Sequence, residues 1–120
     1  MLTLGLDPGL GTTGYGLVRQ NGNGDLELID YGVILTPARQ ALENRLLILY
    51  EQMRNLLLLH KPDHAAVEKL FFAKNITTAI SVGHARCVMM LALAQSSIKV
   101  IEFSPPEIKQ AITGYGGADK

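Results

Sequence analysis

Hydrophobic and small or polar residues alternate at the start of the chain, which is the period of a β-strand with one buried face. In residues 2–7 the leucines occupy every second position, so Asp7 is predicted on the opposite face, at the end of the strand. Further strands are predicted at about residues 13–20 and 25–36. Asn21-Gly22-Asn23-Gly24 separates them and is typical of a type I′ hairpin turn. These three strands predict an antiparallel meander.

The pattern changes after Pro37, where large apolar residues recur every three or four positions and predict a helix over about residues 38–60. The predicted buried stripe consists of Leu42, Leu46, Leu49, Met53 and Leu56. A strand at residues 65–68, a helix at about 75–96, a strand at 99–103 and a short helix after Ser104 follow. The order βββαβαβα predicts one α/β domain over residues 1–120. Its mixed five-stranded sheet has three antiparallel strands, with strands one, four and five parallel.

The composition excludes several classes of protein. The 120 residues are 48% hydrophobic, which excludes intrinsic disorder, and eleven basic residues balance eleven acidic ones. A DNA-binding surface would therefore have to be a local basic patch. The sequence has neither a signal peptide nor an apolar run that could span a membrane, so we expect a cytoplasmic protein. The single cysteine, Cys87, excludes an intrachain disulfide, and its apolar neighbours predict a buried thiol.

The first candidate for chemistry is Asp7, which is followed by the glycine-rich segment 8–16. A carboxylate at a strand end, next to backbone without bulky side chains, lets a phosphate and a divalent cation approach. Mg²⁺ prefers such oxygen ligands. The alternative is a tight hairpin in which the glycines only provide positive φ angles and the aspartate is solvated.

The second candidate is Glu68, at the end of the predicted interior strand. Ligand sites in such sheets gather at the carboxyl ends of parallel strands. If strands one and four are adjacent, Asp7 and Glu68 lie side by side, and two carboxylates so close repel unless a cation lies between them. The alternative is a rim glutamate paired with Lys69 or Lys74.

Two further segments indicate binding surfaces. Phe71 and Phe72 lie between lysines, and an exposed aromatic flanked by lysines can stack on a nucleic-acid base; the alternative is one Phe in the core and one at a subunit contact. In the second helix, Ala79, Gly83 and Cys87 recur every four residues on a helix that is apolar all round. This pattern predicts a symmetric dimer about the helix, against the alternative of packing only on the chain's own sheet.

Taken in order, these motifs resemble the RuvC family of bacterial Holliday-junction resolvases. The resemblance rests on residues 5–9 and 13–16, Ala66-Val67-Glu68, Phe71–Asn75, Gly83–Arg86 and Ser104–Lys109. It implies an RNase H-like fold, a homodimer and hydrolysis of phosphodiesters in two strands of a four-way DNA junction. It also implies two Mg²⁺ ions per active site in the complete protein, a role in recombination and repair, and RuvA and RuvB as partners.

The resemblance also implies roles for single residues. Asp7 and Glu68 match metal-binding acids, Phe71 matches the aromatic that stacks at the opened junction centre, and Lys109 and Lys120 match lysines near the scissile phosphate. The further candidates for DNA contact are Phe72, Lys74, Asn75 and Arg86. The family continues into a last helix that carries another catalytic aspartate, which we expect to be missing here. Two metal ions need more ligands than two carboxylates supply.

Two other functions remain open at this point. One is a nucleotide-binding ATPase of the actin/Hsp70/sugar-kinase type, whose phosphate loop is also an aspartate followed by a Gly/Thr-rich hairpin. Such proteins need a second lobe, for which 120 residues leave no room. The other is a junction-binding module without catalytic activity.

Overall fold

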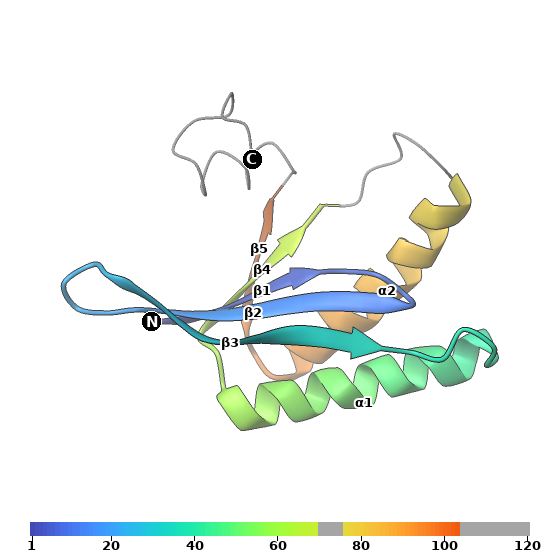
Figure 1. The fold of residues 1–120 in the computed structure, drawn as a ribbon, viewed down its shortest axis with the longest axis horizontal. Helices are drawn as coiled ribbons and strands as arrows, with labels where there is room; N and C mark the ends of the chain where they lie inside the picture. The colour runs from blue at the N-terminus through green and yellow to red at the C-terminus, as the bar shows by residue number, and fades with distance from the viewer. Residues whose placement is uncertain (70–75, 104–120) are drawn as a thin grey trace.

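The computed structural model describes residues 1–69 and 76–103 (Figure 1). Three consecutive strands are followed by two helix–strand units. The elements are β1 (Leu2–Asp7), β2 (Thr12–Gln20), β3 (Leu26–Leu35), α1 (Leu42–His60), β4 (His64–Glu68), α2 (Ile76–Gln95) and β5 (Lys99–Phe103). The predicted helix after Ser104 lies outside the described residues. Within the described ranges, neither helix combines the length and apolar character needed to cross a membrane.

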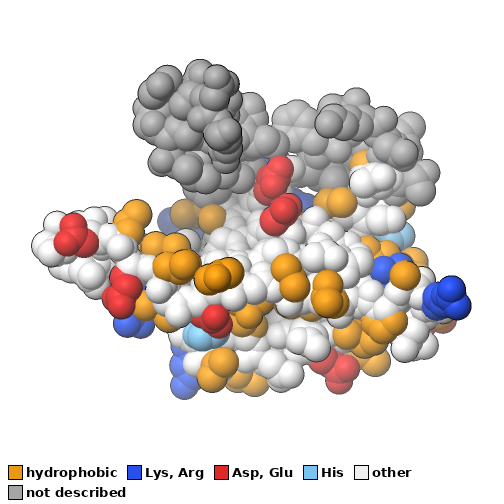
Figure 2. All heavy atoms as spheres, viewed as in Figure 1, with side chains coloured by type: hydrophobic (Ala, Val, Ile, Leu, Met, Phe, Trp, Pro, Cys, Tyr) orange, Lys and Arg blue, Asp and Glu red, His pale blue; other side chains and the backbone are white. Residues whose placement is uncertain are grey.

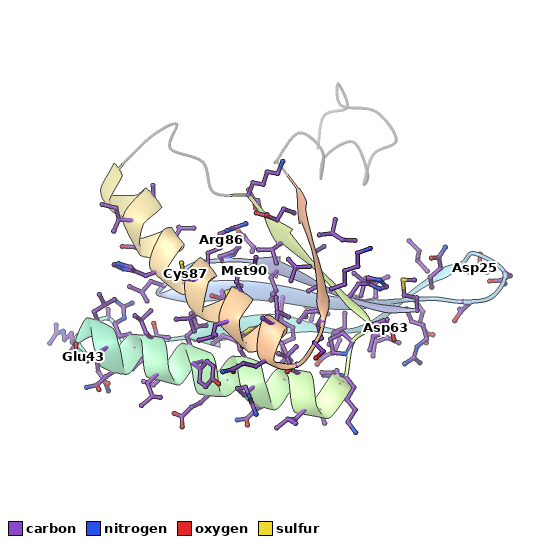
Figure 3. All side chains as sticks on the ribbon, turned by 180° about the vertical axis from the view of Figure 1, so that it is seen from behind. Asp25, Glu43, Asp63, Arg86, Cys87 and Met90 are labelled. Carbon is purple, nitrogen blue, oxygen red and sulfur yellow. The ribbon has the colours of Figure 1, made fainter. Side chains whose placement is uncertain are left out.

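The five strands form one sheet in the order β3-β2-β1-β4-β5. β1 pairs antiparallel with β2 and parallel with β4, and β4 pairs parallel with β5. The predicted topology is therefore confirmed. Among the described elements, both helices lie on the same side of the sheet, so the other side is free of helices (Figures 1 and 3).

The core lies between the sheet and the two helices. The alternating leucines of β1 point into it, because Leu2, Leu4 and Leu6 are all buried, and Val67 of β4 lies beside them. The buried helix residues are Leu49, Met53 and Leu57 from α1 and Ala79, Ala85, Met89, Ala92 and Leu93 from α2. Since β1 buries its even positions, its odd positions, including Asp7, are placed on the helix-free side.

Three local predictions are wrong. The hairpin turn is not type I′, because Gly24 is the only glycine with positive φ (+89°) among the described residues. In α1 the predicted stripe residue Leu42 is 41% exposed, whereas Leu57, near the other end of the helix, is buried. The buried face shifts along the helix because a straight helix drifts relative to a repeat of four and three. Cys87 is exposed, since the sheet-facing side of α2 passes through Ala85 and Met89.

Candidate functional site

The helix-free face has a floor of small residues. The strand register aligns Gly5 of β1 with Gly16 of β2 and Ala66 of β4, and it aligns Asp7 with Gly14. A Cβ atom added at Gly16 would meet nothing within 4 Å. Figure 2 views this face and shows acidic side chains grouped near its centre. A large ligand can therefore approach the backbone of the central strands.

Asp7 and Glu68 are neighbours at the edge of this floor. The paired register of β1 and β4 reaches Leu6 and Val67, and each strand then continues by one residue, to Asp7 and Glu68. Adjacent strands are about 4.8 Å apart, so the two carboxylates project side by side from the carboxyl ends of parallel strands. The structure thus brings together the two acids that the sequence indicated.

The register that aligns these acids is fixed at the opposite end of the strands. The backbone N–H of Leu2 donates to Oδ2 of Asp63 at 2.8 Å, and the N–H of Asp63 donates to the carbonyl of Leu2 at 2.8 Å. A shift by one residue would turn every side chain of β4 to the other face. Asp63 was missed by the sequence analysis, because a side-chain bond to a backbone group 61 positions away leaves no motif in the sequence.

Side-chain hydrogen bonds of two threonines stabilise the turn that follows Asp7. Thr13 is fully buried, donates its hydroxyl proton to the carbonyl of Gly9 at 2.7 Å and accepts from the N–H of Gly9 at 3.3 Å. Thr36 donates to the carbonyl of Leu10. A Cβ at Gly9 would lie 2.2 Å from the Thr12 carbonyl oxygen, so glycine is required there by space. Thr13 and Thr36 were not singled out from the sequence, because hydroxyls that bond backbone leave no spacing signal.

The glycines of residues 9–16 do not serve positive φ angles. Within the described part of the chain, the glycine with positive φ is Gly24, far along the hairpin. The alternative reading of segment 8–16 as a turn motif alone therefore loses its physical basis. The second alternative, a rim ion pair, also fails for Lys69: among the described residues, Glu68 makes no ion pair with it.

Among residues 1–69 and 76–103, no cation of the chain forms an ion pair with either carboxylate. Partial burial raises the pKa of Glu68, and the negative charge of Asp7 and a side-chain hydrogen bond between the two carboxyls raise it further. A positive ion between the oxygens would remove the repulsion. The site therefore suits a hard divalent cation, which takes carboxylate oxygens as ligands.

Glu68→Gln is expected to raise the melting temperature of the metal-free chain at neutral pH. The folded state holds the Glu68 proton more tightly than the unfolded state, so the free energy of unfolding falls as pH rises from 4.5 through the raised pKa. Glutamine does not titrate in this range, so the variant does not undergo this fall in the free energy of unfolding. Thermal unfolding in EDTA should show the difference at pH 7, and the difference should disappear below pH 4.5.

The matched control for this prediction is Glu51→Gln, which removes the same charge from an exposed position on α1. Its melting temperature should stay within about a degree of the unsubstituted chain, as exposed substitutions usually do. A Glu68→Gln variant that is less stable than the unsubstituted chain at pH 7 would show that the Glu68 carboxylate already has a favourable partner.

The donor set fits one shared ion. No cluster of three or more His, Cys, Asp or Glu residues that could hold a metal occurs among the residues the structure describes. Asp7 and Glu68 would supply two carboxylates to such an ion, and a second ion would need ligands from elsewhere. Mg²⁺ is commonly bound in this way, by one or two carboxylates with substrate phosphate oxygens completing its shell.

The remaining predicted site residues are distributed differently. Arg86 lies on α2 beneath the end of β4, where its guanidinium pairs with Glu102 of β5. The other predicted residues lie outside the described part of the chain and stay predictions; they are Phe71, Phe72, Lys74, Asn75, Lys109 and Lys120.

Sequence comparisons with known proteins agree on one family. The family model described as crossover junction endodeoxyribonuclease RuvC matches residues 3–120. Relatives with that name from Petrotoga mobilis and Chloroflexus aurantiacus are 52% and 53% identical over 120 residues, and the chain covers 73% of each. Among solved structures, Thermus thermophilus RuvC in complex with a Holliday junction substrate is similar with a TM-score of 0.92 and 28% identity. That match covers 100% of this chain and 73% of the other.

Proposed function

Because the chain belongs to the RuvC family of crossover junction endodeoxyribonucleases, we propose that it hydrolyses phosphodiesters in two strands of four-way DNA junctions, with Asp7 and Glu68 holding Mg²⁺. The observation that carries the proposal is the pair of adjacent carboxylates on the helix-free face of the sheet, next to the small residues of its central strands. Family membership also removes the ATPase alternative, since the relatives named above are nucleases.

The roles of the two acids follow from their position. Both are ligands, because two carboxylates that repel each other are best used to hold a cation between them. When bound, divalent ions supply stabilisation of the charge on the attacking and leaving oxygens of the phosphodiester. Asp7 and Glu68 would hold the ion by presenting their oxygens to it, and the ion would in turn orient the scissile phosphate. A second ion belongs to the proposal, with its further ligands outside the described residues.

The experiment for this function is cleavage of a synthetic four-way junction in Mg²⁺, with linear duplexes of the same arm sequences as the matched control. We expect paired nicks in two opposite strands of the junction and none in the duplexes. ATP should bind no more tightly than GTP or phosphate. Equal cutting of junction and duplex would contradict the proposed selectivity, and junction binding without nicks would favour a non-catalytic module.

Phe71→Ala is expected to weaken productive binding of the junction without changing the melting temperature by more than about one degree. In the proposal Phe71 stacks on a base at the opened centre, an interaction worth about 1–3 kcal/mol per base. Fluorescence of a 2-aminopurine at the junction centre should therefore fall short of the unsubstituted protein's signal, while affinity for linear duplex stays the same. A large drop in melting temperature would instead place Phe71 in the core.

The proposed active form is a homodimer that pairs two copies of α2. This helix has an exposed apolar stripe made of Ile80, Cys87, Leu91 and Ala94, and Ile80 and Leu91 are 52% and 54% exposed. Half-buried Gly83 lies within the stripe and permits close approach of a second helix. Ala79, predicted to share this face, is instead buried in the chain's own core. A twofold axis through the stripe would place two active sites on one dimer, as paired cutting requires.

The cellular part of the proposal rests on the family alone. It comprises recombination and repair as the process, RuvA and RuvB as partners in branch migration, and the cytoplasm as the location. Co-purification of the protein with RuvA and RuvB on an immobilised four-way junction, and not on duplex DNA, would support these partners.

A further inference from the structure

Arg86 connects α2 to the strand end that presents Glu68. Its Nε donates a hydrogen bond to the backbone carbonyl of Glu68 at 3.4 Å, and its guanidinium forms an ion pair with the Glu102 carboxylate. The Arg86 side chain is only 19% exposed. In Figure 3 it extends from α2 toward the ends of β4 and β5.

These contacts lie on the helix side of the sheet, below the floor of the site. Glu102 is aligned with Val67, whose side chain is fully buried in the core, so Glu102 faces α2. Glu68, the next residue, faces the opposite side. Arg86 therefore holds the main chain of Glu68 from one face of the sheet while the Glu68 carboxylate points out from the other.

The end of β4 needs such a contact. The paired register of β4 with β1 reaches Val67 and stops there, so Glu68 is the first residue of β4 beyond that ladder. Its backbone is held by pairing with Phe103 of β5 on one side and by the Arg86 hydrogen bond from below. Groups that orient a metal ligand from behind commonly set the affinity of the ion.

We propose that Arg86, held in place by Glu102, is a positioning residue that fixes the Glu68 carboxylate for metal binding. This inference rests on the proposed function, in which Glu68 is a ligand. It gives Arg86 a role different from the DNA contact expected from the sequence, because the guanidinium charge is already paired within the chain. It also joins the metal site to the helix proposed to form the dimer.

The test is a double-substitution cycle with Arg86→Lys, Arg86→Gln, Glu102→Gln and the pair Arg86→Gln/Glu102→Gln. Arg86→Lys keeps the charge, but its compact ammonium cannot reproduce the planar fork with which the guanidinium reaches both partners. For each protein we would measure Mn²⁺ binding without DNA by electron paramagnetic resonance, junction affinity in EDTA, and the melting temperature. The control is Arg54→Gln on α1, whose side chain contacts Gln95 away from the site.

We expect each single substitution at Arg86 to weaken Mn²⁺ binding by about tenfold, in the range usual for outer partners of metal ligands. Glu102→Gln should also weaken Mn²⁺ binding. The double variant should bind Mn²⁺ no more weakly than Arg86→Gln alone, because both substitutions break the same series of contacts to Glu68. Junction affinity should change by less than about twofold, the scatter allowed for independent sites.

Three results would overturn the inference. If Arg86 variants lose salt-dependent junction affinity and Glu102→Gln gains it, Arg86 is a DNA contact. If melting temperatures fall while Mn²⁺ affinity is unchanged, the ion pair is only structural. If the two substitutions are additive, they act separately. Failure of the proposed function is distinct from all three, because the unsubstituted protein would then bind Mn²⁺ no better than Asp7→Asn does.

Discussion

Replacing Asp7 by asparagine is expected to abolish junction cleavage while the fold and the affinity for the junction are kept. Asparagine has the same shape but no charge, so the shared ion loses half of its charged ligand pair. Metal ions contribute several kcal/mol to stabilising the transition state, so the cleavage rate should fall by roughly three orders of magnitude or more. Single-turnover cleavage in Mg²⁺ measures the loss, and junction binding in EDTA shows that the surface is intact.

The matched control is Asp25→Asn, the same chemical change on the exposed β2–β3 hairpin, far from the site (Figure 3). Its cleavage rate should equal that of the unsubstituted protein. Asp7→Asn should also relieve the repulsion on Glu68 and so leave the metal-free chain at least as stable. Cleavage by Asp7→Asn at an undiminished rate with Mg²⁺ would remove Asp7 from the metal site.

Placing a charge on the apolar stripe of α2 is expected to separate the dimer. Leu91→Glu would put two unpaired carboxylates near the proposed twofold axis. Burying such charges costs about 3 kcal/mol or more, so the dimer dissociation constant should rise at least about 100-fold. Leu59→Glu on α1, at a residue 76% exposed and away from the stripe, is the control. Analytical ultracentrifugation gives the dissociation constants.

The exposed thiol of Cys87 provides a second readout for the same interface, because it is the chain's single cysteine and lies on the stripe. A short bismaleimide should cross-link two unsubstituted chains and fail with Cys87→Ser or Leu91→Glu. Paired nicking of junctions should be lost together with the cross-link in Leu91→Glu, whereas Cys87→Ser, which lacks only the thiol, should still nick in pairs. A folded monomer at tens of micromolar, with unimpaired paired nicking, would contradict the dimer proposal.

Local periodicity predicted most of the fold. The leucine alternation of residues 2–7 placed Asp7 opposite the core, and the strand order followed from the spacing of helices and strands, so the adjacency of Asp7 and Glu68 could be inferred from sequence. The α1 stripe was displaced because a straight helix drifts relative to a repeat of four and three, so Leu42 at its start is 41% exposed and Leu57 near its end is buried. Periodicity indicates a face but not how far the partner surface extends.

Side-chain contacts between distant segments, unlike the pairing of whole strands, could not be predicted. The Asp63 bonds to Leu2 and the Arg86 bond to Glu68 join residues 61 and 18 positions apart, and neither leaves a repeat or motif in the sequence. The prediction that Cys87 is buried was wrong for the same reason. A helix that is apolar all round offers no sequence signal for which side meets its own sheet, and the structure shows that Ala85 and Met89 do.

A Mn²⁺ titration of the DNA-free protein, followed by electron paramagnetic resonance, tests whether Asp7 and Glu68 together hold a divalent ion. We expect about one ion per chain in the unsubstituted protein and in Asp25→Asn, and Mg²⁺ should compete for it, as expected for a site of oxygen ligands. In Asp7→Asn and in Glu68→Gln the Mn²⁺ affinity should be at least about tenfold lower. Equal Mn²⁺ affinity in all four proteins would show that these two carboxylates do not hold the ion.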